Sequence, residues 1–374
     1  MDGAAGSRLL DTFLEAVRID SPSGEEAAFA RWCVDRLTAL GCVVRVDDAA
    51  KVTGSDSGNV IAEFAATAAG ATIVLSAHLD TVEPGRGIEP IVEDGTVRSA
   101  GDTVLGSDDK AGIAAILETL AVLRETGRPH ARVRVLLTTS EEIGLQGAHA
   151  LDVADCGGDV CLVLDAAGEV GGVVTGAPTH FTFTATFRGV AAHAGVQPEK
   201  GRSAVLMAAR AIAAMPLGRL DELTTSNVGG ISGGGATNVV PAECVLRGEC
   251  RSLGATRVVE VREAMDAAMQ RAADEAGGSV EVEWKREYDG YRYEDGDPVL
   301  EIVVAGVRAA GFEPYLFFTG GGSDANVLTS KGLPAVALSC GMTDVHSTGE
   351  TIAVSEIEGL VRVLLATIGG AVSS

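Results

Sequence analysis

Short apolar segments alternate with helical patterns through the first half of the chain, and this alternation is its most restrictive feature. Five strand-like runs are mostly apolar: Val43–Val46, Val60–Phe64, Ile73–Ala77, Val133–Thr138 and Val160–Leu164. Helical periodicity occurs between them, as in Ala111–Glu125, which Gly127 closes. The run Ser23–Glu26 is typical of a capping box and should open a helix that ends at Gly41. Short apolar strands separated by helices predict a buried, mostly parallel sheet of the α/β class.

A change of pattern at Thr179 indicates a second domain. Phe alternates with Thr or Ala in HFTFTATFRG, which is typical of a strand with one buried face. The elements that follow, up to residue 287, complete the order strand, helix, strand, strand, helix, strand of the ferredoxin-like split motif. After the polar linker YDGYRYEDGDP the first kind of pattern resumes. We therefore expect an inserted domain at 179–287 within a discontinuous α/β domain of residues 1–178 and 288–374.

The acidity of the chain limits its partners. It has 29 Lys+Arg against 52 Asp+Glu, a formal charge of −23, and no basic run. Nucleic-acid binders need clustered positive charge, so no nucleic-acid partner is expected. No segment reaches the roughly 20 apolar residues of a membrane span, and the N-terminus is typical of an amphipathic helix rather than a signal peptide. Seven scattered cysteines without a C-x-x-C pair fit reduced thiols, so we expect a cytoplasmic protein.

Residue types that bind metals occur at the ends of the predicted strands or beside the helices that follow them. The set is His78, Asp80, Asp108, Glu141, Glu142, Asp165 and His346. In open α/β sheets ligands bind at the carboxyl ends of the strands, so these side chains should converge on one edge.

Each motif alone also has a structural explanation. In S-A-H-L-D, Asp80 could hold one ring nitrogen of His78 while the other binds a metal, but an Asp beside a surface His is the commoner case. Glu141 and Glu142 could form an acidic helix start, and the Asp pair in L-G-S-D-D-K-A-G could cap a helix. The shared position at strand ends favours the metal site. Two His, two Asp and one Glu are too many ligands for one catalytic zinc and suit two metals that share an Asp.

Six motifs in order resemble the dinuclear zinc exopeptidase family of peptidase T, carboxypeptidase G and the aminoacylase-type deacylases. They are H-L-D-T-V, L-G-S-D-D-K-A-G, T-S-E-E-I-G-L-Q-G, the strand-terminal Asp165, G-V-A-A-H-A-G-V-Q-P-E-K-G-R-S-A and D-V-H-S-T-G-E. The likeness covers nearly the whole chain and is strongest for peptidase T-like aminopeptidases. It implies a zinc-exopeptidase-like mixed sheet with helices on both faces, plus an inserted ferredoxin-like lid and dimerisation domain.

The resemblance also implies the metal ligands. His78 and Asp165 resemble the ligands of one metal. Glu142 and His346 resemble those of the second, and Asp108 resembles the bridge between the two. Nitrogen and oxygen ligands without thiolates suit Zn²⁺, Co²⁺ or Mn²⁺, and zinc is the expected metal.

Further roles follow from the same resemblance. Glu141 resembles the general base, and Asp80 the catalytic Asp behind the ligands. His193 resembles a histidine that stabilises the substrate carbonyl, often in the site of the partner subunit. Asn238 and Arg251 resemble lid residues that hold the carboxylate or oxyanion of the substrate.

The remaining candidates rest on weaker patterns. Gly321 and Gly322 lie in G-G-G-S-D, which occupies the place of the family's substrate loop. Without the resemblance, His193 and Arg251 would be explained as structural residues. Three other histidines are predicted to be structural: His130, His149 and His180.

These roles predict metal-dependent hydrolysis of a terminal peptide bond in a short peptide, as in a tripeptide aminopeptidase. A metal-bridging water would lose its proton to Glu141 and attack a polarised carbonyl. A homodimer through the inserted domain is expected. The alternative is a carboxypeptidase or an N-acyl-amino-acid deacylase on the same scaffold. A non-catalytic scaffold and a nucleotide-binding protein are less favoured, because every ligand position is filled and no G-x-G-x-x-G or P-loop follows an early strand.

Overall fold

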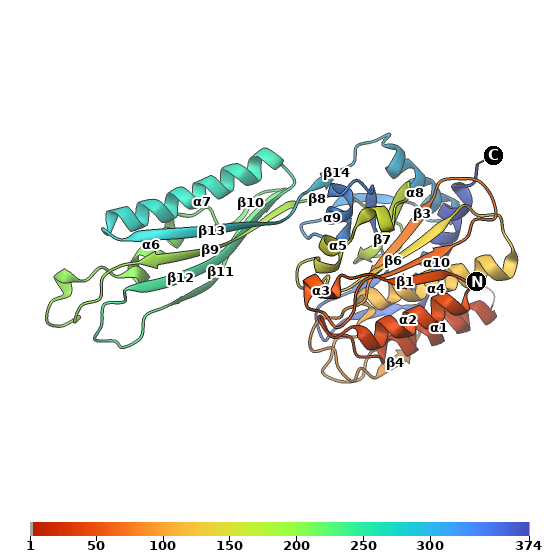
Figure 1. Cartoon of the computed structure of the whole chain (residues 1–374), viewed down its shortest axis with the longest axis horizontal. Helices are drawn as coiled ribbons and strands as arrows, with labels where there is room; N and C mark the ends of the chain where they lie inside the picture. The colour runs from red at the N-terminus through yellow and green to blue at the C-terminus, as the bar shows by residue number, and fades with distance from the viewer. Residues whose placement is uncertain (1–2, 374) are drawn as a thin grey trace. The chain divides into compact units, whose positions relative to one another are not determined.

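The computed structural model describes residues 3–373, and the chain divides into two compact units (Figure 1). Unit 2 comprises Gly176–Arg292 and the short segment Thr319–Gly322, and unit 1 comprises the rest. These bounds lie near the predicted domain bounds of 179 and 287. The division into domains at those predicted residues stays a prediction.

A nine-stranded mixed sheet forms the centre of unit 1. Its order is β1 (Val43–Val46), β2 (Val60–Phe64), β6 (Val133–Thr138), β3 (Ile73–His78), β7 (Val160–Ala166), β16 (Ala335–Ser339), β8 (Gly172–Ala177) and β14 (Tyr291–Arg292), with β15 (Tyr315–Phe318) paired to β8. The central strands β6, β3, β7 and β16 are parallel, whereas the flanking pairs β1–β2, β2–β6, β16–β8 and β14–β8 are antiparallel. The parallel centre brings the carboxyl ends of these strands to one edge.

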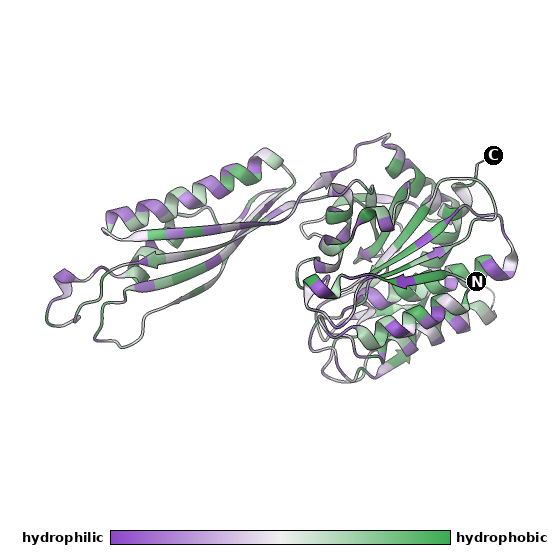
Figure 2. Ribbon diagram, viewed as in Figure 1, coloured by the Kyte–Doolittle hydropathy of each residue, from purple (hydrophilic) through white to green (hydrophobic). Residues whose placement is uncertain are grey.

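Helices cover both faces of this sheet, as the buried apolar strands require. On one face α4 (Ser107–Thr126) contacts β3 and β7 and packs against α1 (Gly3–Val17) and α10 (Val354–Gly370). On the other face α9 (Asp324–Ser330) contacts β7 and β16 and packs against α5 (Gln146–Ala150) (Figure 1). Apolar residues fill the central strands between the two helical layers (Figure 2). The other helices of unit 1 are α2 (Ala27–Ala39), α3 (Ala50–Thr53) and α8 (Pro298–Ala309).

One local prediction for unit 1 is wrong, and one sheet was not predicted. The capping box at Ser23 does not form: the N-cap of α2 is Glu26, and the Ser23 hydroxyl donates to Asp80 instead. A second, four-stranded sheet was not predicted. Its order is β17 (Met342–Thr343), β18 (Thr351–Ala353), β5 (Thr96–Ser99) and β4 (Pro90–Glu93). These strands have two to four residues and are partly exposed, so they lack the apolar runs that marked the central strands.

Unit 2 is an antiparallel sheet with two helices. Its elements are β9 (Thr179–Arg188), α6 (Ala204–Ala214), β10 (Gly218–Asp221), β11 (Thr224–Gly233), β12 (Glu243–Ser252), α7 (Ala255–Glu275) and β13 (Ser279–Tyr288). The spatial order β10-β11-β12-β9-β13 is the ferredoxin-like arrangement with one added edge strand, β10. Phe181, Phe183 and Phe187 alternate along β9 into a core with the helices, and α7 is amphipathic along its length (Figure 2).

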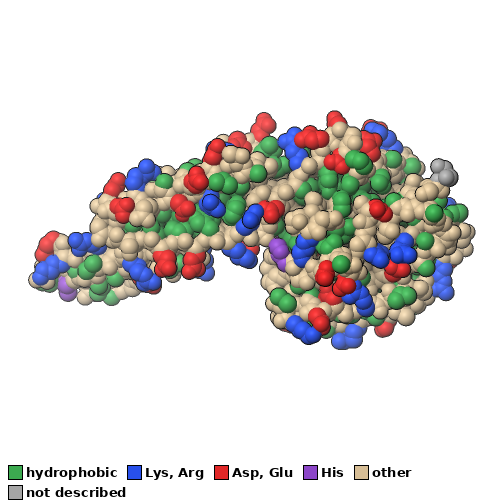
Figure 3. All heavy atoms as spheres, turned by 45° about the horizontal axis from the view of Figure 1, so that its top comes forward, with side chains coloured by type: hydrophobic (Ala, Val, Ile, Leu, Met, Phe, Trp, Pro, Cys, Tyr) green, Lys and Arg blue, Asp and Glu red, His purple; other side chains and the backbone are tan. Residues whose placement is uncertain are grey.

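Acidic and basic side chains are interspersed on the face that Figure 3 shows. In residues 3–373 every helix is too short or too polar to span a membrane.

A close backbone approach at Gly147 generates the first testable prediction. Gly147 is the second residue of α5 and lies beside the end of β6, where its N–H donates to Thr139 O at 2.9 Å. A Cβ there would overlap Thr139 O and come 2.5 Å from Asn59 Oδ1. We expect Gly147→Ala to lower the free energy of unfolding by about 1–3 kcal/mol, the usual range for overpacking. Chemical denaturation measures this, and Gly101→Ala, where a Cβ meets nothing within 4 Å, is the control. Equal stability of the two variants would contradict the prediction.

Candidate metal centre

The metal-ligand candidates of unit 1 gather where the parallel strands end. His78 is the last residue of β3, Asp165 lies near the end of β7, and Glu142 follows β6. Asp108 lies in the first turn of α4, where its backbone and that of Asp109 are not helical. His346 belongs to the loop between β17 and β18. The structure therefore brings all five predicted ligands together.

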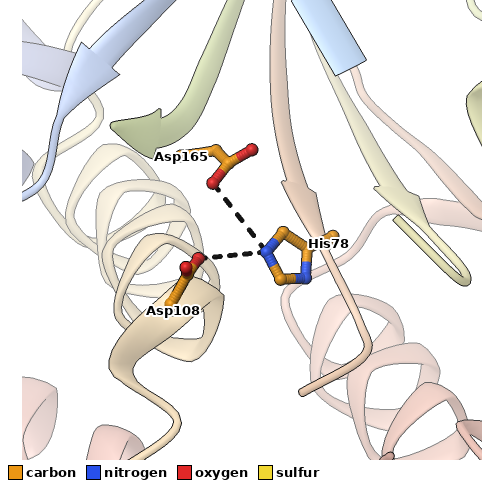
Figure 4. Close-up of side chains that lie close together, drawn as sticks. All are labelled: His78, Asp108 and Asp165. Atoms are coloured by element: carbon orange, nitrogen blue, oxygen red, sulfur yellow. Dashed lines mark hydrogen bonds and ion pairs between the residues drawn. The ribbon is translucent and has the colours of Figure 1, made fainter. Parts of the chain in front are cut away.

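His78, Asp108 and Asp165 form one group (Figure 4). Nε2 of His78 lies 3.0 Å from Asp108 Oδ1 and 3.9 Å from Asp165 Oδ1. The imidazole is 1% exposed, so little water competes for it. Its other nitrogen, Nδ1, is 2.9 Å from the backbone oxygen of Asp80, which fixes the ring with Nε2 toward the two carboxylates.

His346, Asp108 and Glu142 form a second group. Nε2 of His346 lies 3.2 Å from Asp108 Oδ2 and 2.9 Å from Glu142 Oε1. The two oxygens of Asp108 thus face different histidines. This is the arrangement of a carboxylate that bridges two cations.

The donor set fits divalent cations. Ligand atoms at 2.0–2.2 Å from a tetrahedral zinc lie roughly 3.3–3.5 Å from one another, close to the separations of 2.9–3.9 Å seen here. Oε1 of Glu142 is buried and, within residues 3–373, lacks an aligned hydrogen-bond donor despite its short distance to His346. A buried carboxylate oxygen without a donor is costly, and a cation would satisfy it.

The protonation of the cation-free chain supports the same fit. Contacts with Asp108 and Glu142 raise the pKa of His346 to about 10. Burial opposes the charge of Asp108, yet the two histidines hold its pKa below the usual range. Burial and neighbouring carboxylates raise the pKa of Glu141 and Asp165 well above theirs. Protons therefore supply the positive charge that this cluster needs, and metal binding would release them.

The carboxylate of Asp80 contacts the His78 ring and has further partners. Oδ1 forms an ion pair with Nδ1 of His78 at 3.5 Å, and the backbone oxygen of Asp80 lies nearer to the same nitrogen, at 2.9 Å. In addition, Oδ1 accepts the amide of Glu141 at 2.9 Å and Oδ2 accepts the amide of Glu142 at 3.1 Å. Asp80 therefore orients the loop that carries both glutamates.

Glu141 is held beside the ligands. Its side chain is 8% exposed, and it lies in a third group with His78 and Glu142. The preceding Ser140 has a left-handed backbone (φ 53°), and its amide and hydroxyl both donate to the buried Glu26 at 2.9 Å. The turn at Ser140 is thereby fixed from within the protein.

Unit 2 holds the predicted lid residues in two separate places. His193 and Asn238 are exposed on adjacent loops, where His193 pairs with Val239 and the Ala194 amide donates to Asn238 O. These loops lie beyond the Arg188 end of β9.

Arg251 lies at the opposite end of the same sheet, paired in register with His180. The span from His180 to Arg188 is about 26 Å at roughly 3.3 Å per strand residue. Arg251 contacts Glu249 at 2.9 Å and the hydroxyl of Tyr288 at 3.4 Å. Asn238 and Arg251 are therefore not brought together within one chain.

The predicted glycine loop belongs to the Arg251 end of unit 2. A Cβ at Gly322 would overlap the ring of Tyr288, and the Gly321 amide donates to Thr319 Oγ1 at 3.1 Å. His180, predicted to be structural, belongs to the same cluster through its 2.9 Å contact with Glu249. His130 is buried against Phe64, as expected of a structural histidine.

Two buried carboxylates beside this centre were not predicted from the sequence. Glu26 and Glu350 are 0% and 2% exposed, and both accept hydrogen bonds from loops that carry ligands. Glu350 stood in the motif D-V-H-S-T-G-E, four residues after His346, which was the available signal. Glu26 offered none beyond its place in the supposed capping box.

Comparisons with known proteins agree with this fold. Residues 175–277 match the family described as a peptidase dimerisation domain, and residues 59–164 match peptidase family M28. The chain is 40% identical to the aminopeptidase PepT of Bacillus cereus ATCC 10987 (TM-score 0.92, 98% of each chain). It is 37% identical to a tripeptidase of Staphylococcus aureus Mu50 (TM-score 0.94, covering 97% of this chain and 98% of that one). It is also 41% identical to the uncharacterized protein YqjE of Bacillus subtilis 168, covering 96% and 97%.

The raised pKa of Asp165 predicts an effect on stability that reverses when metal is added. A carboxyl group whose pKa is raised in the folded chain does not affect the free energy of unfolding at a pH below its pKa in the unfolded chain, about 4. It lowers the free energy of unfolding most at a pH above its pKa in the folded chain. In the absence of metal, Asp165→Asn should therefore stabilise the protein at pH 8 by about 0.5–2 kcal/mol, and the gain should fade toward pH 4. Zinc should stabilise the wild type, and it should stabilise the variant less because the variant lacks one ligand.

Thermal and chemical unfolding with and without a chelator measure both effects. Asp11→Asn, an exposed change on α1, is the control and should alter neither. A variant less stable than wild type at pH 8 without metal would contradict the prediction.

Proposed function

The chain belongs to the peptidase T-like M20 family of peptidases, and from this membership we propose that it is a two-metal exopeptidase of short peptides, a tripeptide aminopeptidase. One observation carries the metal part of the proposal: the two oxygens of Asp108 face His78 and His346 separately. The substrate part rests on the two solved relatives that are named an aminopeptidase and a tripeptidase.

The residues of unit 1 divide between two cation positions. His78 and Asp165 would hold one cation, Glu142 and His346 the other, and Asp108 both. Bound there, two divalent cations would lower the pKa of a water molecule and polarise the peptide carbonyl. The ligand set suits zinc, and cobalt or manganese can replace it.

Glu141 is proposed as the group that moves the proton. It takes a proton from the attacking water on its carboxylate and gives it to the departing amine. It lies in one group with His78 and Glu142, so its carboxylate is beside the proposed cation positions. Asp80 accepts the backbone amide of each glutamate and so orients the loop that carries both.

Residues of unit 2 are proposed to bind the substrate. Arg251 would hold its carboxylate, beside the loop of Gly321 and Gly322. His193 and Asn238 are exposed at the far end of the unit 2 sheet, so we propose that they act on the site of a partner subunit in a homodimer. The match of residues 175–277 to a dimerisation domain supports this pairing.

Adjacent substitutions test the division of labour between the two glutamates. Glu141→Gln should keep both cations and lower kcat by about 10²–10⁴, the usual contribution of a general base. Glu142→Gln should lower the metal content instead, because it removes a ligand. Metal analysis and turnover of a tripeptide with each purified variant measure this. Near-normal turnover by Glu141→Gln would overturn the assignment.

Blocked peptides test the direction of cleavage. An aminopeptidase should hydrolyse a tripeptide with a free N-terminus, fail on its N-acetylated form, and release the N-terminal residue first. A carboxypeptidase would instead lose activity when the C-terminus is amidated, and a deacylase would prefer the acetylated peptide. Product analysis with the zinc-, cobalt- and manganese-loaded protein separates the three. Preference for the acetylated form would overturn the aminopeptidase proposal.

A further inference from the structure

Glu350 is a buried carboxylate whose hydrogen bonds all go to one ligand-bearing loop. It is 2% exposed and follows His346 by four residues. Oε2 accepts the amides of Leu105 and Gly106, both at 2.8 Å. Oε1 accepts the hydroxyl of Ser107 at 2.5 Å and the amide of Asp108 at 3.0 Å.

The loop that Glu350 holds determines where Asp108 points. Gly106 has a left-handed backbone (φ 69°), and Asp108 has extended rather than helical torsion angles (φ −81°, ψ 102°). The regular helix begins only after Asp109. The backbone of Asp108 therefore departs from the repeat of α4, and Glu350 binds its amide together with the three residues before it.

A simple helix cap does not explain this contact. A capping carboxylate comes from the residues just before the helix, whereas Glu350 lies 242 positions along the chain from Asp108. It also joins the loop of one ligand, Asp108, to the loop of another, His346. The separation between these two ligands is thus fixed through a single side chain.

We propose that Glu350 is a positioning residue that sets the bridging carboxylate of Asp108 for cation binding. This inference rests on the proposed two-metal function. Without the charge of Glu350, the loop of Asp108 should be held less firmly and the carboxylate of Asp108 should take more than one orientation. Both cations should therefore bind more weakly. Residues that hold metal ligands in orientation typically contribute about 10–100-fold in metal affinity.

Cobalt titration of metal-free protein, followed by visible absorption, tests the proposal. Glu350→Gln keeps the size of the side chain and should weaken cobalt binding by about 10–100-fold and alter the spectrum at saturating cobalt. The control is Glu118→Gln, which removes another buried carboxylate of α4, the helix that carries Asp108. Glu118 pairs with Arg8 of α1. This control variant should lower the melting temperature without changing the cobalt affinity or the spectrum.

A second variant guards against a folding defect. Ser107→Ala removes one of the four donors, leaves every charge in place, and should weaken cobalt binding by about threefold. Wild-type affinity and spectrum in both Glu350→Gln and Ser107→Ala would overturn the positioning role alone. An equal loss of affinity in Glu118→Gln would also overturn it, because the effect would then be one of general stability. Wild-type protein that binds no cobalt would overturn the proposed function, and the positioning role with it.

Discussion

Negative charge packed into a buried sheet edge is the constraint on which the rest of this structure depends. The carboxylates fall into two groups according to what neutralises them. Glu350 accepts backbone amides and a hydroxyl, so neutral donors stabilise its charge, and Asp80 combines such donors with an ion pair to His78. Asp108, Glu142 and Asp165 face one another and two histidines instead. Buried carboxylates without enough donors are costly and a cation would offset that cost, so the second group is where the proposed cations would be held.

The fold provides both groups through its parallel centre and its sharp loops. Because β3, β6 and β7 are parallel, their carboxyl ends deliver ligands to one edge. The loops that follow leave the sheet through left-handed residues such as Ser140 and Gly106. A left-handed serine costs about 1–3 kcal/mol and persists only where the surroundings hold it. Here Glu26 accepts both donors of Ser140, so the carboxylates behind the ligands also stabilise the turns that carry them.

The features predicted correctly from the sequence are those that depend on local pattern. Four strands of the nine-stranded sheet begin where their apolar runs begin, at Val60, Ile73, Val133 and Val160, and all five predicted ligands lie together in unit 1. The errors concern partners distant in sequence. Glu26 meets Ser140 across 114 residues and Glu350 meets Asp108 across 242, and no spacing rule reports such contacts. The spacing in S-A-H-L-D did predict that Asp80 meets the His78 ring, but not that the backbone oxygen of Asp80 lies nearer to Nδ1 than its carboxylate does.

The length of the unit 2 sheet bears on how a complete site would be assembled. Arg251 pairs with His180 near one end of β9, and the loop of His193 lies beyond Arg188 at the other end, where Arg188 is about 26 Å from His180 along the strand. A tripeptide spans at most about 11 Å when fully extended. The side chains of His193 and Arg251 in one chain therefore cannot contact the same short peptide while the sheet is intact. If both residues bind substrate, they serve different peptides, and a site that uses both must draw them from two chains. In the proposed homodimer, the second chain would then supply part of the site and not only stabilise the protein.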